Sequence, residues 1–251
     1  MMQLTTVSKK QSDNTALVYW RVGINRKGVV EVRLDAGSTD VELIAELAAI
    51  RHLLMDCRVL NVRPSSGIGI RLCVSRGAIR KLTKGTSAKK YASRFASLLK
   101  GRLQGVDIQV SHSMEYMIQE TDERYRESLS ELLVNTTEQV TLGEVVETTV
   151  MGQLAISQHA LERYSQRLVS MNNSQFIRKP WASLVRRLRN PELLQQNLDS
   201  HVLAHKYRKY GNKSTVEIWK HPTDTLHFTI VVNSEKQRTL VTVFERAQQY
   251  C

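Results

Sequence analysis

Hydrophobic positions in the first half of the chain follow a strand-like pattern before a helical one. The β-branched and aromatic stretches 15–24 and 28–36 flank the turn sequence NRKG, which predicts a β-hairpin. Asp40 can accept hydrogen bonds from the free N–H groups of a first helical turn, so a helix is predicted over 41–55. The later apolar pattern predicts strands at 58–62, 70–74 and 106–112, and helices at 75–85 (opened by a serine cap), 87–101 and 120–134.

The second half has a helical pattern followed by a strand pattern. Residues 135–149 are polar and lack helical periodicity, so we expect a boundary at about 140–150, with domains at 1–140 and 150–251. The pattern predicts helices at 156–168 (with a serine cap) and 180–190 (with Pro180 in its first turn), a helical continuation through 191–200, and strands at 201–211, 214–221, 226–233 and 239–246. The predicted fold class is α+β / α/β: a mixed sheet with flanking helices, then a small α+β domain with an antiparallel sheet.

The charges occur in blocks. The formal net charge is +12 over 251 residues. Residues 58–106 contain no Asp or Glu and 12 Lys and Arg, whereas residues 107–148 contain ten acids and two bases. Residues 149–251 then carry 15 bases and seven acids. Ordinary solvated helix faces could carry such charges, but an acid-free run of 49 residues favours a polyanion partner, nucleic acid before an anionic membrane.

Several other classes of protein are disfavoured. No run reaches about 18 apolar residues, so no transmembrane helix is expected. The N-terminal segment MMQLTTVSKKQSDNTA has no apolar stretch typical of a secretory signal. Cys57, Cys73 and Cys251 form no CxxC pair, which argues against a zinc knuckle or a disulfide framework. We therefore expect a cytoplasmic protein with no membrane partner, no cofactor and no bound metal.

The predicted helix at 41–55 carries a carboxylate, Glu46, on a face of apolar and small residues. This helix and two later stretches resemble the RNase H-like fold over roughly residues 15–132. That family has a glutamate at the start of an E-L-x-A pattern, an aspartate before a serine on the fourth strand, and a histidine and an aspartate after the last strand. The matching sequences here are AELAAIRHLL with Glu46, IRLCVSRGAIRKL with Val74 and Ser75, and VDIQVSHSMEYMIQETDERYRESL with His112 and Asp122.

The resemblance implies a domain that has lost metal-dependent catalysis. RNase H catalysis uses several carboxylates to hold two magnesium ions. The stretch VYWRVGI, read as the family's first strand, brings Arg21 in place of an acid, and the fourth strand brings Val74. Of the carboxylates that the family pattern requires, only Glu46 and Asp122 are present. We therefore expect Glu46 to be a helix-surface or ion-paired residue and not a metal ligand.

The second half resembles the RelE/barnase-like toxin ribonucleases. The resemblance rests on ISQHALERYSQRL at 156–168 and on the closing stretch TLVTVFER. In that group a helix-borne histidine and arginine precede a twisted antiparallel sheet, and catalysis needs no metal. His159 and Arg163 lie four positions apart, on one helix face. The resemblance implies His159, Arg163 and Tyr207 as catalytic residues of an active enzyme; His221 and His227 are further acid–base candidates. A lone helix histidine is more often a satisfied surface or core residue than a functional one, and Trp181 and Trp219 are expected in the core.

Taken together, these features predict an RNA-binding protein that is not an enzyme, with a metal-independent endoribonuclease as the alternative. Tyrosines interleaved with cations at 206–210 suit single-stranded RNA, because bases stack on rings while phosphates pair with cations. A third interpretation is a DNA-binding accessory factor, since RNase H-like folds also serve integrases. The expected RNA-binding residues are Arg76, Arg80, Lys81, Lys84, Lys89, Lys90, Arg94, Arg163, Arg186, Arg187, Arg189, Lys206, Tyr207, Arg208, Lys209 and Tyr210.

The pairing of these two domain types is similar to the RNA-binding proteins of the jumbo-phage nucleus, the chimallin C family. That similarity implies a phage-encoded protein that binds messenger RNA in the host bacterial cytoplasm, at or near a phage replication compartment. It also implies self-association or contact with a phage shell protein. The acidic block 107–148 could pair with a basic block of another molecule and so promote assembly.

Overall fold

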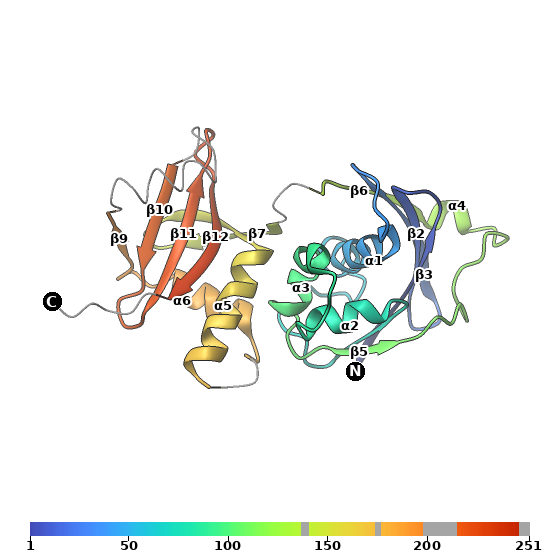
Figure 1. Cartoon of the computed structure of the whole chain (residues 1–251), viewed down its shortest axis with the longest axis horizontal. Helices are drawn as coiled ribbons and strands as arrows, with labels where there is room; N and C mark the ends of the chain where they lie inside the picture. The colour runs from blue at the N-terminus through green and yellow to red at the C-terminus, as the bar shows by residue number, and fades with distance from the viewer. Residues whose placement is uncertain (137–140, 174–176, 198–214, 246–251) are drawn as a thin grey trace. The chain divides into compact units, whose positions relative to one another are not determined.

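The computed structural model describes residues 1–136, 141–173, 177–197 and 215–245 (Figure 1). The chain divides into two compact units, Met1–Glu138 and Gln139–Cys251. Each unit has its own mixed sheet with flanking helices, as predicted for an α+β fold. In the part of the chain that the structure describes, no helix is both long enough and apolar enough to span a membrane.

Unit 1 contains a mixed sheet with the strand order β5-β4-β1-β2-β3-β6. β1, β2 and β3 form an antiparallel meander; β4 pairs in parallel with β1, β5 with β4, and β6 with β3. The strands are β1 (Met2–Lys10), β2 (Thr15–Val22), β3 (Arg26–Leu34), β4 (Ile70–Val74), β5 (Asp107–Val110) and β6 (Leu129–Val134). The hairpin β2–β3 and the strands β4 and β5 confirm the pattern predicted from the sequence.

The central strand β1 was not predicted, because threonine and serine interrupt its apolar pattern. β1 nevertheless lies between β4 and β2, and its residues Leu4 to Ser8 are buried. Side chains alternate between the two faces of a strand. Val7 packs in a cluster with Leu17 and Tyr19 of β2, while Thr6 points to the opposite face, where its hydroxyl contacts helix α1 (Val41–Arg51). Strand β1, in the middle of the sheet, therefore presents hydroxyl side chains to helix α1.

Helix α1 packs against β1, β2 and β3, and its buried residues lie all around it. It continues as a π-helical turn, His52–Asp56, which agrees with the predicted helix at 41–55. The apolar cluster on the other face of the sheet includes Val29 of β3 and Met117 and Ile118 from the segment before β6. The core of unit 1 thus has α1 on one face of the sheet and this segment on the other.

Several predictions for unit 1 were wrong. Residues 58–62 are turns and not a strand, with positive φ angles of 51° at Arg58 and 65° at Asn61. The predicted helix at 87–101 is broken into a 3₁₀ turn, Lys90–Arg94, and α3 (Ser97–Lys100). The predicted acidic helix at 120–134 reduces to the short α4 (Tyr125–Ser128) followed by β6. Pairing with β3 overrides the helical propensity of the leucines in β6, because propensity is weak compared with tertiary contacts.

Unit 2 contains a second mixed sheet with the strand order β7-β8-β12-β11-β10-β9 (Figure 1). The prediction of an antiparallel sheet was wrong at one position, since β8 and β12 pair in parallel. β7 lies within the polar stretch 135–149, which was expected to mark the domain boundary, and pairs there with β8 in an antiparallel arrangement. The strands are β7 (Thr141–Thr148), β8 (Gly152–Ser157), β9 (Leu194–Gln196), β10 (Thr215–Lys220), β11 (Leu226–Val232) and β12 (Arg238–Glu245).

Helix α5 (Gln158–Met171) packs against β12 and contacts α6 (Pro180–Leu188). The predicted serine cap is confirmed: the Ser157 Oγ accepts a hydrogen bond from the Ala160 N–H at 3.1 Å. Pro180 is in the first turn of α6, as predicted. The expected helical continuation through 191–200 was wrong, because β9 pairs there with β10. The predicted strand at 201–211 lies outside the described residues.

Candidate nucleic-acid interface

Glu46 is fully buried, so the expectation of a surface or ion-paired residue was wrong. Its Oε1 accepts hydrogen bonds from the Thr6 hydroxyl at 2.8 Å and the Ser75 N–H at 2.7 Å. Its Oε2 accepts from the hydroxyls of Ser75, at 2.7 Å, and Ser8, at 3.3 Å. Helix α1, the central strand β1 and the end of β4 therefore meet at one carboxylate surrounded by hydroxyl groups.

This arrangement also explains the start of helix α2 (Gly77–Thr83). Ser75 was expected to cap a helix, but the structure shows no side-chain hydrogen bond at the N-cap, which is Arg76. The Ser75 hydroxyl is instead directed to Glu46 and to the Ser8 hydroxyl, 3.1 Å away. The Ser75 hydroxyl donates to a buried carboxyl group and accepts no hydrogen bond from a first-turn N–H of α2, so the serine belongs to the core and not to the cap.

The Glu46 cluster is not built to hold metal ions. Among the described residues, no group of three or more His, Cys, Asp and Glu side chains could hold a metal. Asp122 accepts a hydrogen bond from the Gln119 N–H at 2.8 Å and lies 3.8 Å from the Lys27 ammonium. Burial raises the pKa of Glu46, while hydrogen bonds from Ser75, Thr6 and Ser8 act in the opposite direction. Neutral hydroxyls around one carboxylate suit a structural core and not a pair of magnesium ions.

The acid-free block contributes both paired and unpaired cations in unit 1. Arg76 forms an ion pair with Glu42, and its Nε lies 3.4 Å from the Ser8 Oγ. Lys89 forms an ion pair with Asp40, whose carboxylate also accepts a hydrogen bond from Tyr91. These contacts hold the pKa of Asp40 below its ordinary value. Arg76 and Lys89 therefore fasten the block to helix α1 as well as carrying charge.

Helix α2 and its C-cap residue, Lys84, together carry three exposed cations of the block. The side chains of Arg80, Lys81 and Lys84 are exposed, and none forms an ion pair with another described residue. The Arg94 guanidinium lies over the Phe95 ring, 4.7 Å from its centroid, and Arg94 is exposed. The side chain of Lys90 lies outside the described residues. Helix α2 is thus the part of the predicted interface where cations remain available to a polyanion.

A pocket of about 320 Å³ adjoins these cations. Arg80 and Lys84 of α2 line it together with Lys100 of α3. Asp107 at the start of β5 also lines it, but this carboxylate is bound to the Arg71 guanidinium at 2.6 Å. The pocket therefore gathers cationic side chains at the edge of the sheet, where β5 is the last strand.

In unit 2, helix α5 brings His159 and Arg163 together as their spacing predicts. Both are exposed, and the Arg163 Nε lies 3.5 Å from the His159 Nε2. The Arg163 guanidinium also donates to the Gln166 Oε1 at 3.1 Å. The other residues expected beside them, Lys206, Tyr207, Arg208, Lys209 and Tyr210, lie outside the described residues.

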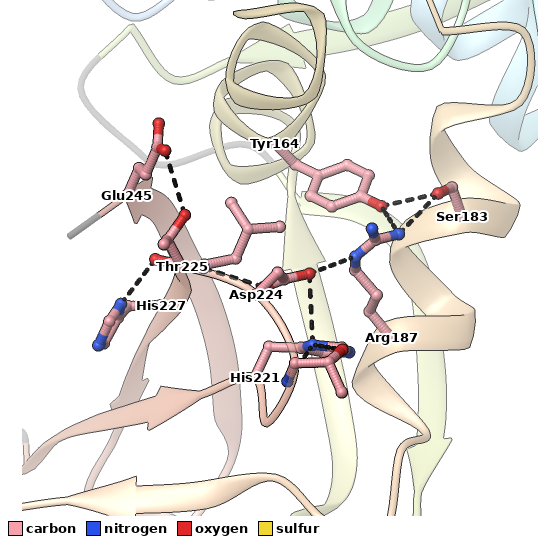
Figure 2. A network of polar contacts seen from close by, with 10 residues as sticks. Tyr164, Ser183, Arg187, His221, Asp224, Thr225, His227 and Glu245 are labelled. Carbon is pink, nitrogen blue, oxygen red and sulfur yellow. Dashed lines mark hydrogen bonds and ion pairs between the residues drawn. The ribbon is translucent and has the colours of Figure 1, made fainter. Parts of the chain in front are cut away.

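Arg187 joins α5, α6 and the β10–β11 turn in a polar network (Figure 2). Its Nε donates to the Asp224 Oδ2 at 3.2 Å, and its Nη1 donates to the hydroxyls of Tyr164, at 3.0 Å, and Ser183, at 3.3 Å. The side chains of Arg187 and Asp224 are 23% and 15% exposed. Arg187 was expected to contact RNA, but this network already engages its guanidinium. Of its neighbours on α6, Arg186 is exposed and Arg189 donates to the Glu147 carbonyl at 3.2 Å.

The further acid–base candidates His221 and His227 do not share a site. The His221 Nδ1 lies 3.3 Å from the Asp224 Oδ2, within the Arg187 network (Figure 2). Burial lowers the pKa of His221, and Arg187 adds to this effect while Asp224 opposes it. The His227 ring instead stacks on Phe244, and its Nδ1 contacts the Thr225 carbonyl at 3.0 Å. Both histidines are buried, so the structural alternative fits their surroundings.

Replacing Arg187 by alanine is expected to lower the free energy of unfolding by about 2 kcal/mol, because Asp224 and the buried Tyr164 hydroxyl lose a common partner. Urea unfolding of the whole chain measures this. Arg186→Ala removes the same charge from an exposed position on the same helix and should change the stability by less than about 0.5 kcal/mol. Equal effects of the two substitutions would show that the network adds no stability.

A chain of polar contacts that was not predicted lies in the π-helical turn after α1. The Cys57 Sγ lies 3.1 Å from the His52 Nε2, and the His52 Nδ1 lies 3.1 Å from the Asp56 Oδ2. The spacing H-x₃-D-C, which places the partners about one helical turn apart, was the available signal. Burial and the Asp56 charge raise the pKa of the Cys57 thiol. The thiol therefore stays protonated at neutral pH, which does not favour a nucleophile.

The predicted positions of the tryptophans were also inexact. Trp219 of β10 is half-buried, and its Nε1 donates to the Glu217 Oε2 at 3.0 Å. Trp181 of α6 is likewise half-buried. Neither belongs to the buried core that was expected to contain them.

Comparison of the chain with protein-family models, with curated proteins and with solved structures found no match.

Proposed function

We propose that the chain is an RNA-binding protein without catalytic activity, in which unit 1 is an RNase H-like domain that lacks a metal site. The single observation that carries the proposal is the exposed row Arg80, Lys81 and Lys84 on α2, which forms no ion pair with other described residues. Unpaired cations on one short helix give a concentrated positive field. A sugar–phosphate chain that neutralises them releases its counterions, which drives binding without reading the base sequence.

The strand order of unit 1 supports the RNase H-like part of the proposal. An antiparallel β1–β3 meander with β4 and β5 added in parallel beside β1, and a helix after β3, is the order that the resemblance implies. β6 is an addition at the other edge. The first strand is β1 and not the hairpin strand that carries Arg21, so the family alignment shifts by one strand. The first strand, where the family has an aspartate, carries Thr6 and Ser8, and these residues surround Glu46 together with Ser75, which follows Val74.

A competition experiment tests the proposal. A fluorescently labelled single-stranded RNA of mixed sequence is bound to the whole chain, and unlabelled single-stranded RNA or duplex DNA is added. We expect RNA to compete more effectively than an equal mass of duplex DNA, with affinity falling steeply as salt is raised. Stronger competition by duplex DNA would support the DNA-binding accessory factor instead. Binding that is unchanged by salt would remove the electrostatic basis of the proposal.

The second candidate function is a metal-independent endoribonuclease, which the contact between His159 and Arg163 favours. A histidine beside an arginine can transfer a proton while the guanidinium stabilises phosphate charge. Incubating labelled RNA with the protein in EDTA separates the two functions. Cleavage that is lost in His159→Ala supports the enzyme, and RNA that stays full-length supports the binding protein. Ser170→Ala is the matched control, because Ser170 is also exposed on α5.

We further propose that the RNA is a phage messenger RNA and that the protein acts in the cytoplasm of a host bacterium. The support is the similarity of the two-domain arrangement to the jumbo-phage RNA-binding proteins. The alternation of basic and acidic blocks along the chain supports self-association on RNA. Mixing the protein with RNA at low salt should produce turbidity that dissolves as salt is raised. A clear solution at every ratio of protein to RNA would contradict self-association.

A further inference from the structure

The pocket beside α2 has the charge and size of a site for one phosphate group. We propose that it binds a single phosphoryl group, which in the proposed function, on which this inference rests, is carried by RNA. Arg80, Lys84 and Lys100 line it, and its volume of about 320 Å³ is at the lower end of the range for small-ligand sites. The pocket can thus enclose a phosphate with its sugar, whereas the surrounding surface of α2 can contact the backbone only from outside.

The local electrostatics favour an anion. Asp107 is the acidic residue of the lining, and its ion pair with Arg71 at 2.6 Å offsets its charge. Arg80 and Lys84 have no acidic partner within the described parts of the chain, so their charges are not offset in the same way. The Lys100 ammonium donates to the Ser93 Oγ at 3.2 Å, which orients its side chain. The pocket therefore keeps a net positive charge.

The lining also distinguishes a phosphate from a nucleobase. A base is held in single-stranded sites mainly by stacking on aromatic rings. The lining contains no aromatic side chain and includes the cationic residues Arg80 and Lys84. Charged N–H donors around a small hollow suit the oxygens of a tetrahedral anion.

Backbone packing shapes one wall of the pocket. Gly67 lies against the segment that leads into β5: a Cβ on Gly67 would be 2.2 Å from the Leu103 carbonyl oxygen and 2.3 Å from the Val106 nitrogen. Gly105 in the same segment has a φ of 84°, which favours glycine. This close contact fixes the 103–106 segment against the rest of unit 1, so the pocket wall does not depend on flexible side chains.

Two substitutions on one helix test the inference. Lys84 lines the pocket, whereas Lys81 is exposed on α2 and does not line it, so Lys84→Ala and Lys81→Ala remove equal charge. Thermal unfolding is followed with increasing inorganic phosphate, at ionic strength held constant with chloride. We expect phosphate to raise the melting temperature of the wild type and of Lys81→Ala. The rise should be smaller by at least two-thirds in Lys84→Ala. Equal shifts in all three proteins, or no shift in the wild type, would overturn the phosphate site.

A second experiment tests whether the phosphate site takes part in RNA binding. Inorganic phosphate at the same constant ionic strength should weaken RNA binding by the wild type at least threefold, and should change RNA binding by Lys84→Ala less than twofold. If the RNA affinity of both proteins depends on salt but is unchanged by phosphate, the pocket inference is overturned and the proposed function stands. Phosphate stabilisation that requires Lys84 in a protein that binds no RNA would instead contradict the proposed function and leave the phosphate site standing.

Discussion

Replacing Glu46 by alanine is expected to lower the free energy of unfolding by about 3 kcal/mol. The substitution removes the common acceptor of the Thr6, Ser8 and Ser75 hydroxyls and of the Ser75 N–H, all in the buried centre of unit 1. A buried donor left without an acceptor costs about 1–3 kcal/mol, and the hydroxyls of Ser8 and Ser75 can partly satisfy each other. Urea unfolding of the whole chain measures the change.

Glu127 supplies the control for this experiment, because it is an exposed glutamate on α4. Glu127→Ala should change the free energy of unfolding by no more than about 0.5 kcal/mol. A loss below about 1 kcal/mol in Glu46→Ala would mean that the hydroxyl cluster holds the sheet and helix together without its carboxylate. In that case the structural role given to Glu46 would be wrong.

The same residue predicts a pH dependence with a definite sign. Burial raises the pKa of Glu46 above its ordinary value of 4.5, so the folded state binds this proton more tightly than the unfolded state. The stabilisation that comes from this tighter proton binding is therefore present below about pH 4.5 and is lost as the pH rises through the folded-state pKa. Glu46→Gln cannot titrate, so the stability of the wild type relative to this variant should fall with rising pH in that window. A relative stability that rises instead would show that the surrounding donors hold an ionised carboxylate.

Removing the exposed cations of α2 is the second large effect that we expect. The triple variant Arg80→Ala, Lys81→Ala, Lys84→Ala should bind single-stranded RNA about 50-fold more weakly at about 0.15 M salt. This follows because each phosphate contact on a single strand adds about 0.7 to the slope of log affinity against log salt concentration, so three contacts add about 2. Fluorescence anisotropy titrations at several salt concentrations give both the affinity and the slope.

The control variant must remove the same charge elsewhere on unit 1. Lys9, Arg124 and Arg126 are exposed and lie outside the acid-free block, so their triple substitution by alanine matches the change in net charge. It should weaken binding less than fivefold. If both triple variants lose affinity equally, RNA responds to the overall charge of the protein, and α2 is not a particular binding surface.

The sequence predicted the elements whose local pattern agrees with their final surroundings. The hairpin at 15–24 and 28–36 follows from its β-branched and aromatic residues, and the helix at 41–55 begins after Asp40 as predicted, although the Asp40 side chain makes no capping hydrogen bond. The strand β1 could not be found in this way, because its buried Thr6 and Ser8 have the composition of an exposed segment. Its position depends on Glu46, a residue about 40 positions later, and no local pattern carries that information.

The candidate site shows the same difference between local and long-range information. The charge pattern of residues 58–106 predicted exposed cations, because twelve bases without an acid cannot all be neutralised within their own segment. It could not distinguish Arg186 from Arg187, which are adjacent on α6. Arg187 is engaged because Tyr164, Ser183 and Asp224 converge on it from elsewhere in the chain, and that convergence exists only in the folded structure.

The proposed function requires that unit 1 binds RNA through its cations and has no metal-dependent chemistry. The most direct measurement is to hold labelled single-stranded RNA with the whole chain in Mg²⁺ and, separately, in EDTA, and then to analyse binding on a native gel and RNA length on a denaturing gel. We expect the RNA to be retarded and full-length in both conditions. Shortened RNA in Mg²⁺ with intact RNA in EDTA, or RNA that is not retarded in either, would contradict it.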